Sequence, residues 1–341
     1  MDDFPANLPR IDIASLPTPV STHVIERPGG TFDIGVKHDE LTSTAYGGNK
    51  VRKLEYLLRR AQDRGAERVA TYGAVGSNHA LATAIHASQV GLACTCFLAH
   101  QKKTPKIPYT LNMHRMLGTE IIPWHSEDHV TLYRRFLQRQ RTLVIPLGGT
   151  SVRGTIGFVN AGFELARQVR AGALAQPARI YIACGTTGSA AGLILGLAAA
   201  GLETDVHAIQ VADNPFASEA KLRRLITKTE SVLSRFDRGF KAPGWQQRLV
   251  WRDDFLAGGY ARVDDATLAA VDTAQQLLGL TLETTYTGKA FAALLHDLQA
   301  PAYDGDLFLY WNTCNAAPLP VTANKPDDLG NIPEEFERYY S

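Results

Sequence analysis

The chain has 341 residues, 45% of them hydrophobic and 20% charged, which is typical of a soluble globular protein of roughly two ordinary domains. Lys and Arg number 35 against 34 Asp and Glu, so the charge balance gives no reason to expect nucleic acid or an anionic membrane as a partner. The first ten residues, MDDFPANLPR, carry acids where an export signal has cations, and no such signal is expected. The four cysteines form neither a CxxC pair nor a dense framework, which predicts reduced thiols in a cytoplasmic protein and no metal site.

The stretch TAYGGNKVRKLEYLL, residues 44–58, puts a lysine at the start of an amphipathic helix. Gly47 and Gly48 permit a turn that residues with a Cβ resist, and Asn49 is the expected N-cap. Lys50 then lies at the end of the helix where the dipole repels cations, so its ammonium loses a proton more readily. A lysine held in this way is a candidate nucleophile. The alternative is an ordinary surface lysine.

Alternating strands and helices follow, the pattern of a mostly parallel sheet with helices on both faces. Strands are expected at 67–75, 92–99, 120–124, 142–149, 178–185, 205–212 and 306–312. Helices are expected at 78–92, 109–118, 130–140, 157–170, 189–202, 217–234, 266–279 and 288–298. The charge-free stretch 180–202 is long enough to span a bilayer, but CGTTGS interrupts it, so no membrane span is expected. The tail after residue 318 is expected to wrap the surface.

The junction YGAVGSNHA, residues 72–80, joins an expected strand to an expected helix. Ser77 or Asn78 is the expected cap of that helix. The first amides of a helix have no partner within it, so they form a site for a carboxylate or a phosphate. The alternative is a plain N-cap. His79 is a weaker candidate for a base or a ligand, because a histidine in the first turn of a helix is more often structural.

The junction ACGTTGSAAGL, residues 183–193, has a loop of small residues between a strand and an apolar helix. Such a loop lets backbone N–H groups converge on a phosphate, and Thr186, Thr187 and Ser189 add hydroxyls. The stretch is neither a Walker loop nor GxGxxG, because the required lysine and acid are missing. The alternative is a tight turn that only small residues fit.

The segment TTYTGKAF, residues 284–291, is expected to place Tyr286 at a strand end and Thr287 just before a helix. A tyrosine in such a position is by default half-buried packing. Lys289 is interpreted as a solvated lysine.

A reactive lysine, an asparagine in a turn, a phosphate loop and a hydroxyl near the C-terminus are together the parts that pyridoxal 5'-phosphate requires. The sequence resembles the fold type II pyridoxal-phosphate enzymes, specifically the D-cysteine desulfhydrase and 1-aminocyclopropane-1-carboxylate deaminase family, in order from Leu16 to Pro318. The segments that carry the resemblance are GGNKVRKLEYLL, GSNHALATA, VIPLGGTSVRGTIGFVNAGFEL, GTTGSAAGLILGL, GGYA and TYTGKAF.

The resemblance implies a fold like that of the tryptophan synthase beta subunit: two open, mostly parallel twisted sheets with helices on both faces. It implies a large cofactor-binding domain from residues 1–48 and 158–341 and a small inserted α/β domain at 49–157. No linker sequence separates the two, in agreement with an insertion. A cytoplasmic homodimer acting on a small amino acid is the expected form of the protein.

The resemblance also assigns roles at the cofactor. Lys50 is expected to form the internal aldimine and, once displaced, to act as the base at the substrate Cα. Asn78 is expected to bond the phenolic oxygen of the cofactor. The phosphate is assigned to Gly185, Thr186, Thr187, Gly188 and Ser189.

For the substrate, the resemblance assigns the carboxylate to Ser77 and to the amides of Asn78 and His79. Tyr286 and Tyr260 match two tyrosines near the substrate. Lys53 matches a further positive residue beside the site.

Thr287 falls where a side chain meets the pyridine nitrogen of the cofactor, a position that is a glutamate in the deaminase. A neutral hydroxyl does not hold a pyridinium electrostatically, so the ring is a weaker electron sink. Expelling a good β leaving group requires a weaker electron sink than opening a cyclopropane ring does. Thr287 therefore favours α,β-elimination.

Two segments depart from the family pattern beside the substrate. Gly76 stands where family members usually have glutamine, and residues 312–315, Asn-Thr-Cys-Asn, replace a His-x-Gly-Gly run. The substrate therefore stays open between D-cysteine or an analogue, the cyclopropane substrate, and the substrate of another lyase or racemase. From a different class, the alternative is a non-catalytic protein that binds a phosphometabolite, but such a protein has no use for GGNK.

Overall fold

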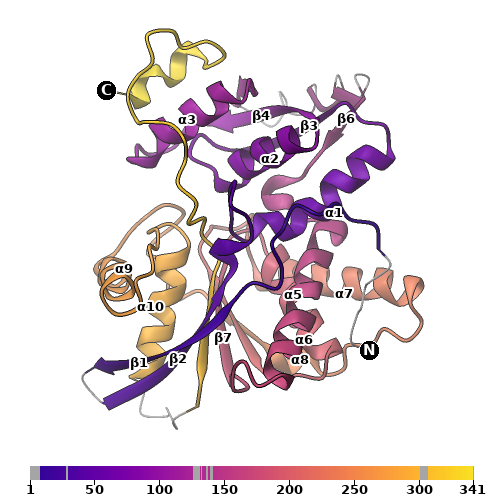
Figure 1. Ribbon diagram of the computed structural model, residues 1–341, viewed down its shortest axis with the longest axis vertical. Helices are drawn as coiled ribbons and strands as arrows, with labels where there is room; N and C mark the ends of the chain where they lie inside the picture. The colour runs from indigo at the N-terminus through magenta and orange to yellow at the C-terminus, as the bar shows by residue number, and fades with distance from the viewer. Residues whose placement is uncertain are drawn as a thin grey trace.

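The computed structural model describes residues 8–27, 30–125, 141–299 and 306–340, with a few residues between 131 and 138, and has two sheets (Figure 1). The larger sheet has six strands in the order β1-β2-β10-β7-β8-β9. These strands are β1 Val20–Arg27, β2 Gly30–His38, β7 Arg179–Cys184, β8 Asp205–Gln210, β9 Leu249–Arg252 and β10 Phe308–Asn312. All its pairs are parallel except β1 with β2.

The smaller sheet has four parallel strands in the order β5-β4-β3-β6. These are β3 Arg68–Ala74, β4 Ala93–Ala99, β5 Glu120–Pro123 and β6 Thr142–Val144. The helices α2 Asn78–Gln89 and α3 Lys106–Met116 accompany it in the upper half of the molecule (Figure 1). The expected architecture of two mostly parallel sheets with helices is thus confirmed. The bounds of the two domains stay a prediction.

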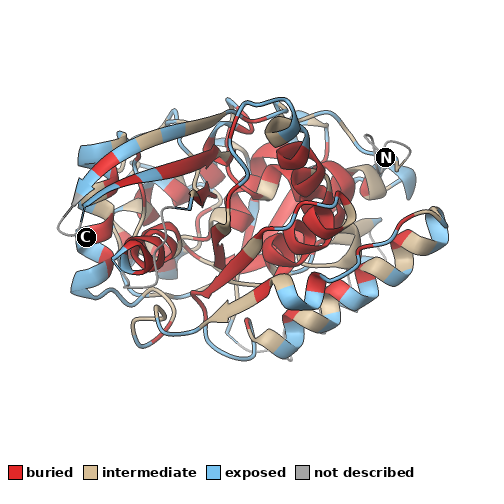
Figure 2. Ribbon diagram, turned by 90° about the horizontal axis from the view of Figure 1, so that it is seen from below, coloured by how far each residue is buried: buried red, intermediate tan, exposed pale blue. Residues whose placement is uncertain are grey.

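Helices cover both faces of the six-stranded sheet (Figure 1). On one face lie α5 Val152–Arg170, α6 Gly188–Ala199, α7 Glu219–Phe236 and α8 Trp245–Arg248, and on the other lie α9 Asp265–Leu278 and α10 Thr287–Leu298. Strand β7 has both faces buried: Ile180 and Ile182 pack with the first group, Tyr181 and Ala183 with the second. Figure 2 shows the buried residues concentrated in these strands and in the helix faces against them.

The charge-free stretch 180–202 divides into β7, a loop and the buried helix α6, as expected. Among the described residues, no helix is both long and apolar enough to cross a membrane.

The structure also differs from the sequence-based expectations. The hairpin of β1 and β2 was not predicted, and α5 begins at Val152 rather than at 157. No strand precedes Tyr286 in the described residues 280–286, and Thr287 is the first residue of α10. Of the helix expected at 130–140, the described residues 131, 133–135, 137 and 138 are helical, and the other positions lie outside the described part of the chain.

The C-terminal tail does more than wrap the surface. Ile332, Phe336 and Tyr339 are at most 4% exposed and belong to the hydrophobic core of the smaller sheet. The last two of these lie in the short 3-10 helix η3 Glu334–Tyr339, which sits at the top of the molecule (Figure 1). Apolar side chains spaced among the acids and prolines of the tail explain why it docks there rather than staying in solvent.

A buried network of charges connects the six-stranded sheet to α1 Lys50–Asp63. The Arg52 guanidinium is 1% exposed and lies between two carboxylates, 2.7 Å from Asp39 Oδ1 and 3.0 Å from Glu164 Oε2. Lys37 Nζ lies 2.6 Å from Glu164 Oε1. Two cations therefore face two anions. Burial raises the pKa of Glu164, but the Arg52 and Lys37 cations outweigh it and lower that pKa to about 2.

Replacement of Arg52 by Met should lower the free energy of unfolding by about 3–5 kcal/mol, because Asp39 is left buried without its partner. Urea unfolding measures the loss. Arg59→Met is the matched control on the same helix: Arg59 and Asp63 are 40% and 42% exposed, so this change should cost less than ~1 kcal/mol. Equal losses in the two variants would contradict the structural importance of the buried network.

Candidate active site

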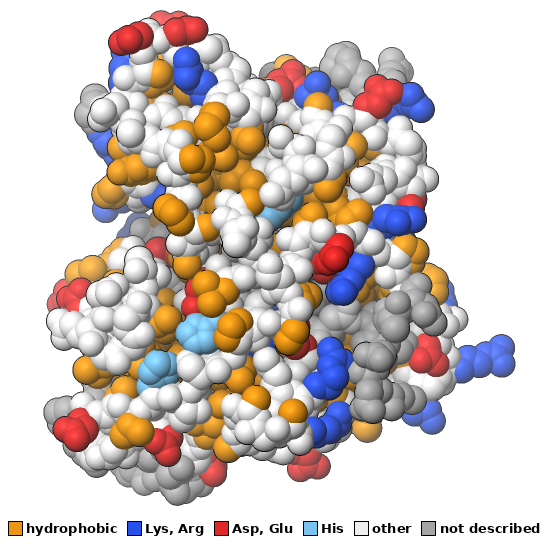
Figure 3. All heavy atoms as spheres, viewed as in Figure 1, with side chains coloured by type: hydrophobic (Ala, Val, Ile, Leu, Met, Phe, Trp, Pro, Cys, Tyr) orange, Lys and Arg blue, Asp and Glu red, His pale blue; other side chains and the backbone are white. Residues whose placement is uncertain are grey.

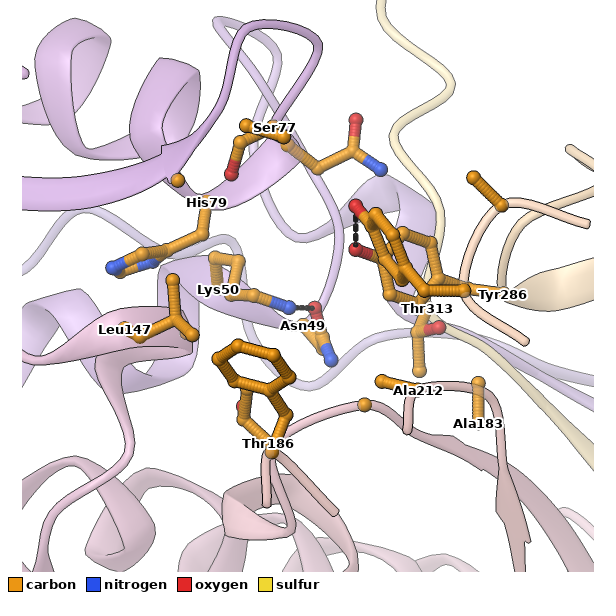
Figure 4. A pocket seen from close by; sticks show the side chains of 18 of the residues that line it. Asn49, Lys50, Ser77, His79, Leu147, Ala183, Thr186, Ala212, Tyr286 and Thr313 are labelled. Atoms are coloured by element: carbon orange, nitrogen blue, oxygen red, sulfur yellow. Dashed lines mark hydrogen bonds between the residues drawn. The ribbon is translucent and has the colours of Figure 1, made fainter. Parts of the chain in front are cut away.

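A cavity of about 590 Å³ lies between the two sheets and is lined by segments from both. Its walls include the residues at the carboxyl ends of β3, β4, β7 and β10, which is where open parallel sheets bind ligands. Figure 3 shows that the molecule narrows between its upper and lower halves, and that the face in view carries both acidic and basic side chains. In Figure 4, Lys50 points into the cavity between Ser77 on one side and Thr186 on the other.

The GGNK turn has the geometry that the sequence predicts. Gly48 has a φ of +93°, and a Cβ there would lie 2.7 Å from the Thr313 carbonyl oxygen. Asn49 occupies the N-cap position, but the expectation that its side chain caps the helix is wrong. Its Nδ2 donates to Ser189 Oγ at 3.0 Å, and its Oδ1 accepts from Lys50 Nζ at 2.8 Å. Asn49 therefore links the reactive lysine to the first turn of α6.

Burial lowers the pKa of Lys50 to about 8, although Glu283 and Cys314 act in the opposite direction. Lys53, one turn further along α1, is 2% exposed, and its Nζ donates to the Gly148 carbonyl at 3.1 Å. Burial and the neighbouring Lys50 hold the pKa of Lys53 well below its ordinary value. Within the described part of the chain Lys53 has no ion pair, so an anion bound here would supply the missing counter-charge.

The loop at 185–189 carries groups that suit such an anion. Thr187 has a φ of +69°, and Gly188 begins the 12-residue helix α6, whose first N–H groups lack intrahelical partners. Thr187 Oγ1 is buried without a hydrogen-bond partner among the described residues. A Cβ on Gly188 would lie 2.9 Å from Lys53 Nζ. Amides, a free hydroxyl and an ammonium thus surround one place, which fits a phosphate.

The remaining residues expected at the phosphate have defined partners. Thr186 Oγ1 accepts from Thr150 Oγ1 at 2.8 Å, and Ser189 Oγ accepts from Asn49. Gly185 packs against Tyr286: a Cβ there would lie 3.0 Å from Tyr286 Cε1.

The start of α2 forms the opposite wall. Of the two predicted caps, Ser77 is the N-cap, and its Oγ accepts the Ala80 N–H at 3.2 Å. Asn78 Oδ1 accepts from the Tyr46 hydroxyl at 3.0 Å and from the Lys106 ammonium. With its oxygen occupied, Asn78 has its Nδ2 group left to donate, which suits a phenolate oxygen.

The His79 side chain is structural. Its Nε2 lies 2.9 Å from Thr71 Oγ1 and 3.1 Å from the Pro146 carbonyl oxygen. Burial, with Lys50 and Lys53 nearby, keeps its pKa well below the ordinary value, so the ring is neutral. The expected contribution of its backbone amide to the anion site is independent of this side-chain role.

Tyr260 and Tyr286 meet at the far side of the cavity. Their hydroxyl oxygens are 2.8 Å apart and their rings pack edge to face. Burial raises the pKa of both phenols, and each hydroxyl is therefore protonated at neutral pH.

The interpretation of Lys289 as a solvated lysine is wrong. Its side chain is fully buried, and Nζ donates to the carbonyls of Leu256 at 2.7 Å and Gly259 at 3.0 Å. Asp213 Oδ2 accepts the Tyr260 N–H at 2.8 Å. The loop that carries Tyr260 is thus held by an ammonium and by a carboxylate, and this support compensates positive φ values at 257, 258, 259 and 261.

Thr287 is buried but does not line the cavity. Its hydroxyl accepts the Glu283 N–H at 2.9 Å and lies 3.1 Å from Glu283 Oε1. Glu283 lines the cavity instead, and its carboxylate accepts the N–H groups of residues 285, 286 and 287. Sequence reasoning missed Glu283; the available signal was an acid just ahead of a helix start, where the dipole favours it.

Of the two departures from the family pattern, residues 313–315 line the cavity and Gly76 precedes Ser77, which lines it. Gly76 leaves room for the Gln101 carboxamide: a Cβ at 76 would lie 3.1 Å from Gln101 Nε2. A carboxamide is therefore present beside Ser77 although position 76 lacks one. Asn315 Oδ1 accepts the Gly47 N–H at 2.6 Å and so braces the GGNK turn. Gln101 was also missed, although its place just after a parallel strand could have identified it.

Replacement of Lys289 by Met should loosen the Tyr260 loop, because two buried carbonyls lose their donor. Hydrogen exchange of the Tyr260 amide should become roughly tenfold faster. Lys228→Met, at an exposed lysine of α7, is the control and should leave that exchange unchanged. Unaltered protection in the Lys289 variant would mean that Asp213 alone holds the loop.

Comparisons with known proteins agree with this geometry. A D-cysteine desulfhydrase from Salmonella paratyphi A is 31% identical over 310 residues, covering 87% of this chain and 91% of that protein. One from Salmonella choleraesuis is 32% identical over the same extent. The solved structure of an ACC deaminase homologue matches with a TM-score of 0.77 at 29% identity, covering 92% of this chain and 93% of the other. A fungal L-serine ammonia-lyase from Rhizomucor miehei shares the fold alone, with a TM-score of 0.58 at 17% identity, over 88% of this chain and 96% of that one.

The family model of the pyridoxal-phosphate dependent enzymes matches residues 13–309. That range contains the lysine, the phosphate-type loop and the tyrosine pair that line the cavity. The chain belongs to the family of pyridoxal-phosphate dependent enzymes.

Proposed function

We propose that this enzyme is a lyase that performs α,β-elimination on a small amino acid with a β leaving group, D-cysteine or an analogue. The products would be an α-keto acid, ammonia and, from cysteine, sulfide. The observation that carries the proposal is the position of Lys50. Its amine, with a pKa lowered to about 8, lies in one cavity with a phosphate-type loop and a helix N-terminus suited to a carboxylate.

Residues on three sides of the cavity would hold the cofactor. Lys50 would bind its aldehyde carbon, the loop at 185–189 with Lys53 its phosphate, and Asn78 its phenolic oxygen. When bound, pyridoxal phosphate supplies the electron sink that stabilises negative charge at the substrate Cα. A non-catalytic binding protein would gain nothing from an amine whose pKa is lowered by burial.

The residues of the chain would then orient the substrate and move protons. Ser77 and the first amides of α2 would bind the carboxylate, so that the Cα–H bond points toward Lys50. Lys50, a weak base close to neutral pH, would take the Cα proton. Tyr260 and Tyr286, both protonated, would offer a hydroxyl to the leaving sulfur.

Cyclopropane opening is the second candidate, and Glu283 is the observation that favours it. A carboxylate at the pyridine nitrogen would strengthen the electron sink, and Glu283 lines the cavity. Its two oxygens already accept three backbone N–H groups, which disperses its charge. We therefore favour elimination. The Thr287 hydroxyl, which the sequence places at the ring nitrogen, instead bonds Glu283 and lies outside the cavity lining, so it is not proposed as the partner of the ring.

The expected homodimeric state and cytoplasmic location belong to the same proposal. The four cysteines are all free thiols, which suits a reducing compartment. Sedimentation of the purified enzyme would measure the number of subunits.

Borohydride trapping of pyridoxal phosphate on the apo-protein should label Lys50, and the extent of labelling should rise with a midpoint near pH 8. The lowered pKa makes the neutral, nucleophilic amine available above that pH, whereas an ordinary lysine reaches it only near pH ~10.4. Peptide mapping identifies the labelled residue. Lys50→Ala should abolish both label and turnover, and a label on Lys53 or Lys289 would overturn the assignment.

The wild-type enzyme should release keto acid and sulfide from D-cysteine and be nearly inactive on 1-aminocyclopropane-1-carboxylate. A coupled assay over D- and L-cysteine, β-chloroalanine and the cyclopropane substrate measures the ratio. Glu283→Gln should move the ratio further toward elimination, because it removes the cavity-lining carboxylate that would raise the proton affinity of the ring nitrogen. Efficient cyclopropane opening by the wild type would show that the preference for elimination is wrong.

A further inference from the structure

The Gln101 side chain lies at the end of the cavity where α2 begins. Gln101 follows β4 by two residues and lines the cavity together with Ser77. Its Oε1 accepts the Gly76 N–H at 3.2 Å, so the oxygen end of the carboxamide is engaged. Its Nε2 has one long contact, 3.4 Å to the Lys102 carbonyl. At least one N–H of Gln101 is therefore left to donate to a ligand.

The backbone of Gln101 is held by the C-terminal tail. The Tyr339 hydroxyl accepts the Gln101 N–H and donates to the Gln101 carbonyl, each at 3.0 Å, across 238 residues of sequence. Tyr339 is 2% exposed, and its hydroxyl lies 3.1 Å from His100 Nδ1. One phenol thus fixes both polar groups of a residue that lines the cavity.

The charge at this end of the cavity suits an anion. The acids that line the cavity in the described part of the chain are Asp213 and Glu283, and both follow strands or precede helices of the larger sheet. The end near Gln101 instead presents the first amides of a 12-residue helix, and Asn78 in the first turn of that helix accepts a hydrogen bond from the Lys106 ammonium.

We propose that Gln101 is a substrate-binding residue that donates from Nε2 to the α-carboxylate of the amino acid, beside Ser77, and that Tyr339 is the residue that positions it. The proposal rests on the proposed function, since it assumes that an amino acid is the ligand. It makes the C-terminal tail part of substrate recognition, although the tail lies outside the match to the family model, which ends at residue 309.

The test measures binding of D-alanine, which has no β leaving group, to the cofactor-loaded enzyme through the change in cofactor absorbance. Ethylamine, the same molecule without its carboxylate, is the paired ligand. Gln101→Glu keeps an oxygen that accepts the Gly76 N–H but removes the donor, and it should raise the dissociation constant for D-alanine roughly tenfold or more. Binding of ethylamine should change less than about threefold.

Tyr339→Phe should raise the same constant by about threefold to tenfold, because Gln101 loses both of its backbone partners. Tyr340→Phe is the matched control: its hydroxyl donates to Asn112 Oδ1 at 2.6 Å, in the same tail but without contact to Gln101. For the β-eliminating substrate, both Gln101→Glu and Tyr339→Phe should raise KM and leave kcat within about threefold, whereas Tyr340→Phe should change neither.

Normal D-alanine affinity in Gln101→Glu would overturn the binding role and leave Gln101 as a support for Gly76. Equal behaviour of the two tyrosine variants would overturn the positioning role of Tyr339. Gln101→Ala serves as a second variant if the glutamate destabilises the fold, and the same loss of D-alanine binding is expected. Failure of the wild-type holoenzyme to bind D- or L-amino acids would instead refute the proposed function, and the inference with it.

Discussion

The buried Arg52 guanidinium is the interaction on which the active site depends. It joins α1 to Glu164 of α5 and to Asp39, the residue that follows β2. Asp39 also accepts the Gly48 N–H through its carbonyl oxygen at 2.8 Å. One acid thereby fixes both the helix that begins with Lys50 and the turn that precedes it. Such a network adds little net stability over well-packed apolar residues, but leaving one of its members unpaired is costly, so it specifies a single position for α1.

A second feature of the site is the number of buried lysines around the cavity. Three of them act on one another: beyond the effect of burial, Lys106 lowers the pKa of Lys50, and Lys50 lowers the pKa of Lys53. Burial opposes charge on all three, but Tyr46, Cys314 and Glu283 outweigh it at Lys106, whose pKa is raised. Lys50 and Lys53 have lowered values. A ligand that brings a phosphate and a carboxylate would balance these charges, and a neutral ligand would not.

Local pattern was sufficient to predict most of the strands and helices and the motif-bearing residues of the site. The GGNK turn, the Ser77 cap and the loop before α6 each depend on residues within one turn of one another. The errors concern side chains whose partners are distant in sequence. Lys289 bonds carbonyls 30 and 33 residues away, and a lysine in a helix's first turn gives no sign of that. Asn49 has a capping residue's position but bonds Ser189, 140 residues away.

The residues missed at the substrate end have the same cause. Nothing near Gln101 in the sequence indicates that its peptide is held by Tyr339. The cavity is divided between the two sheets. The phosphate-type loop and α6 belong to the larger sheet, whereas Ser77, Gln101 and the docked tail belong to the smaller one. Because separate elements of the fold form the two ends, Gly76 and Gln101 determine the contacts available at one end of the cavity, and the loop at 185–189 determines those at the other.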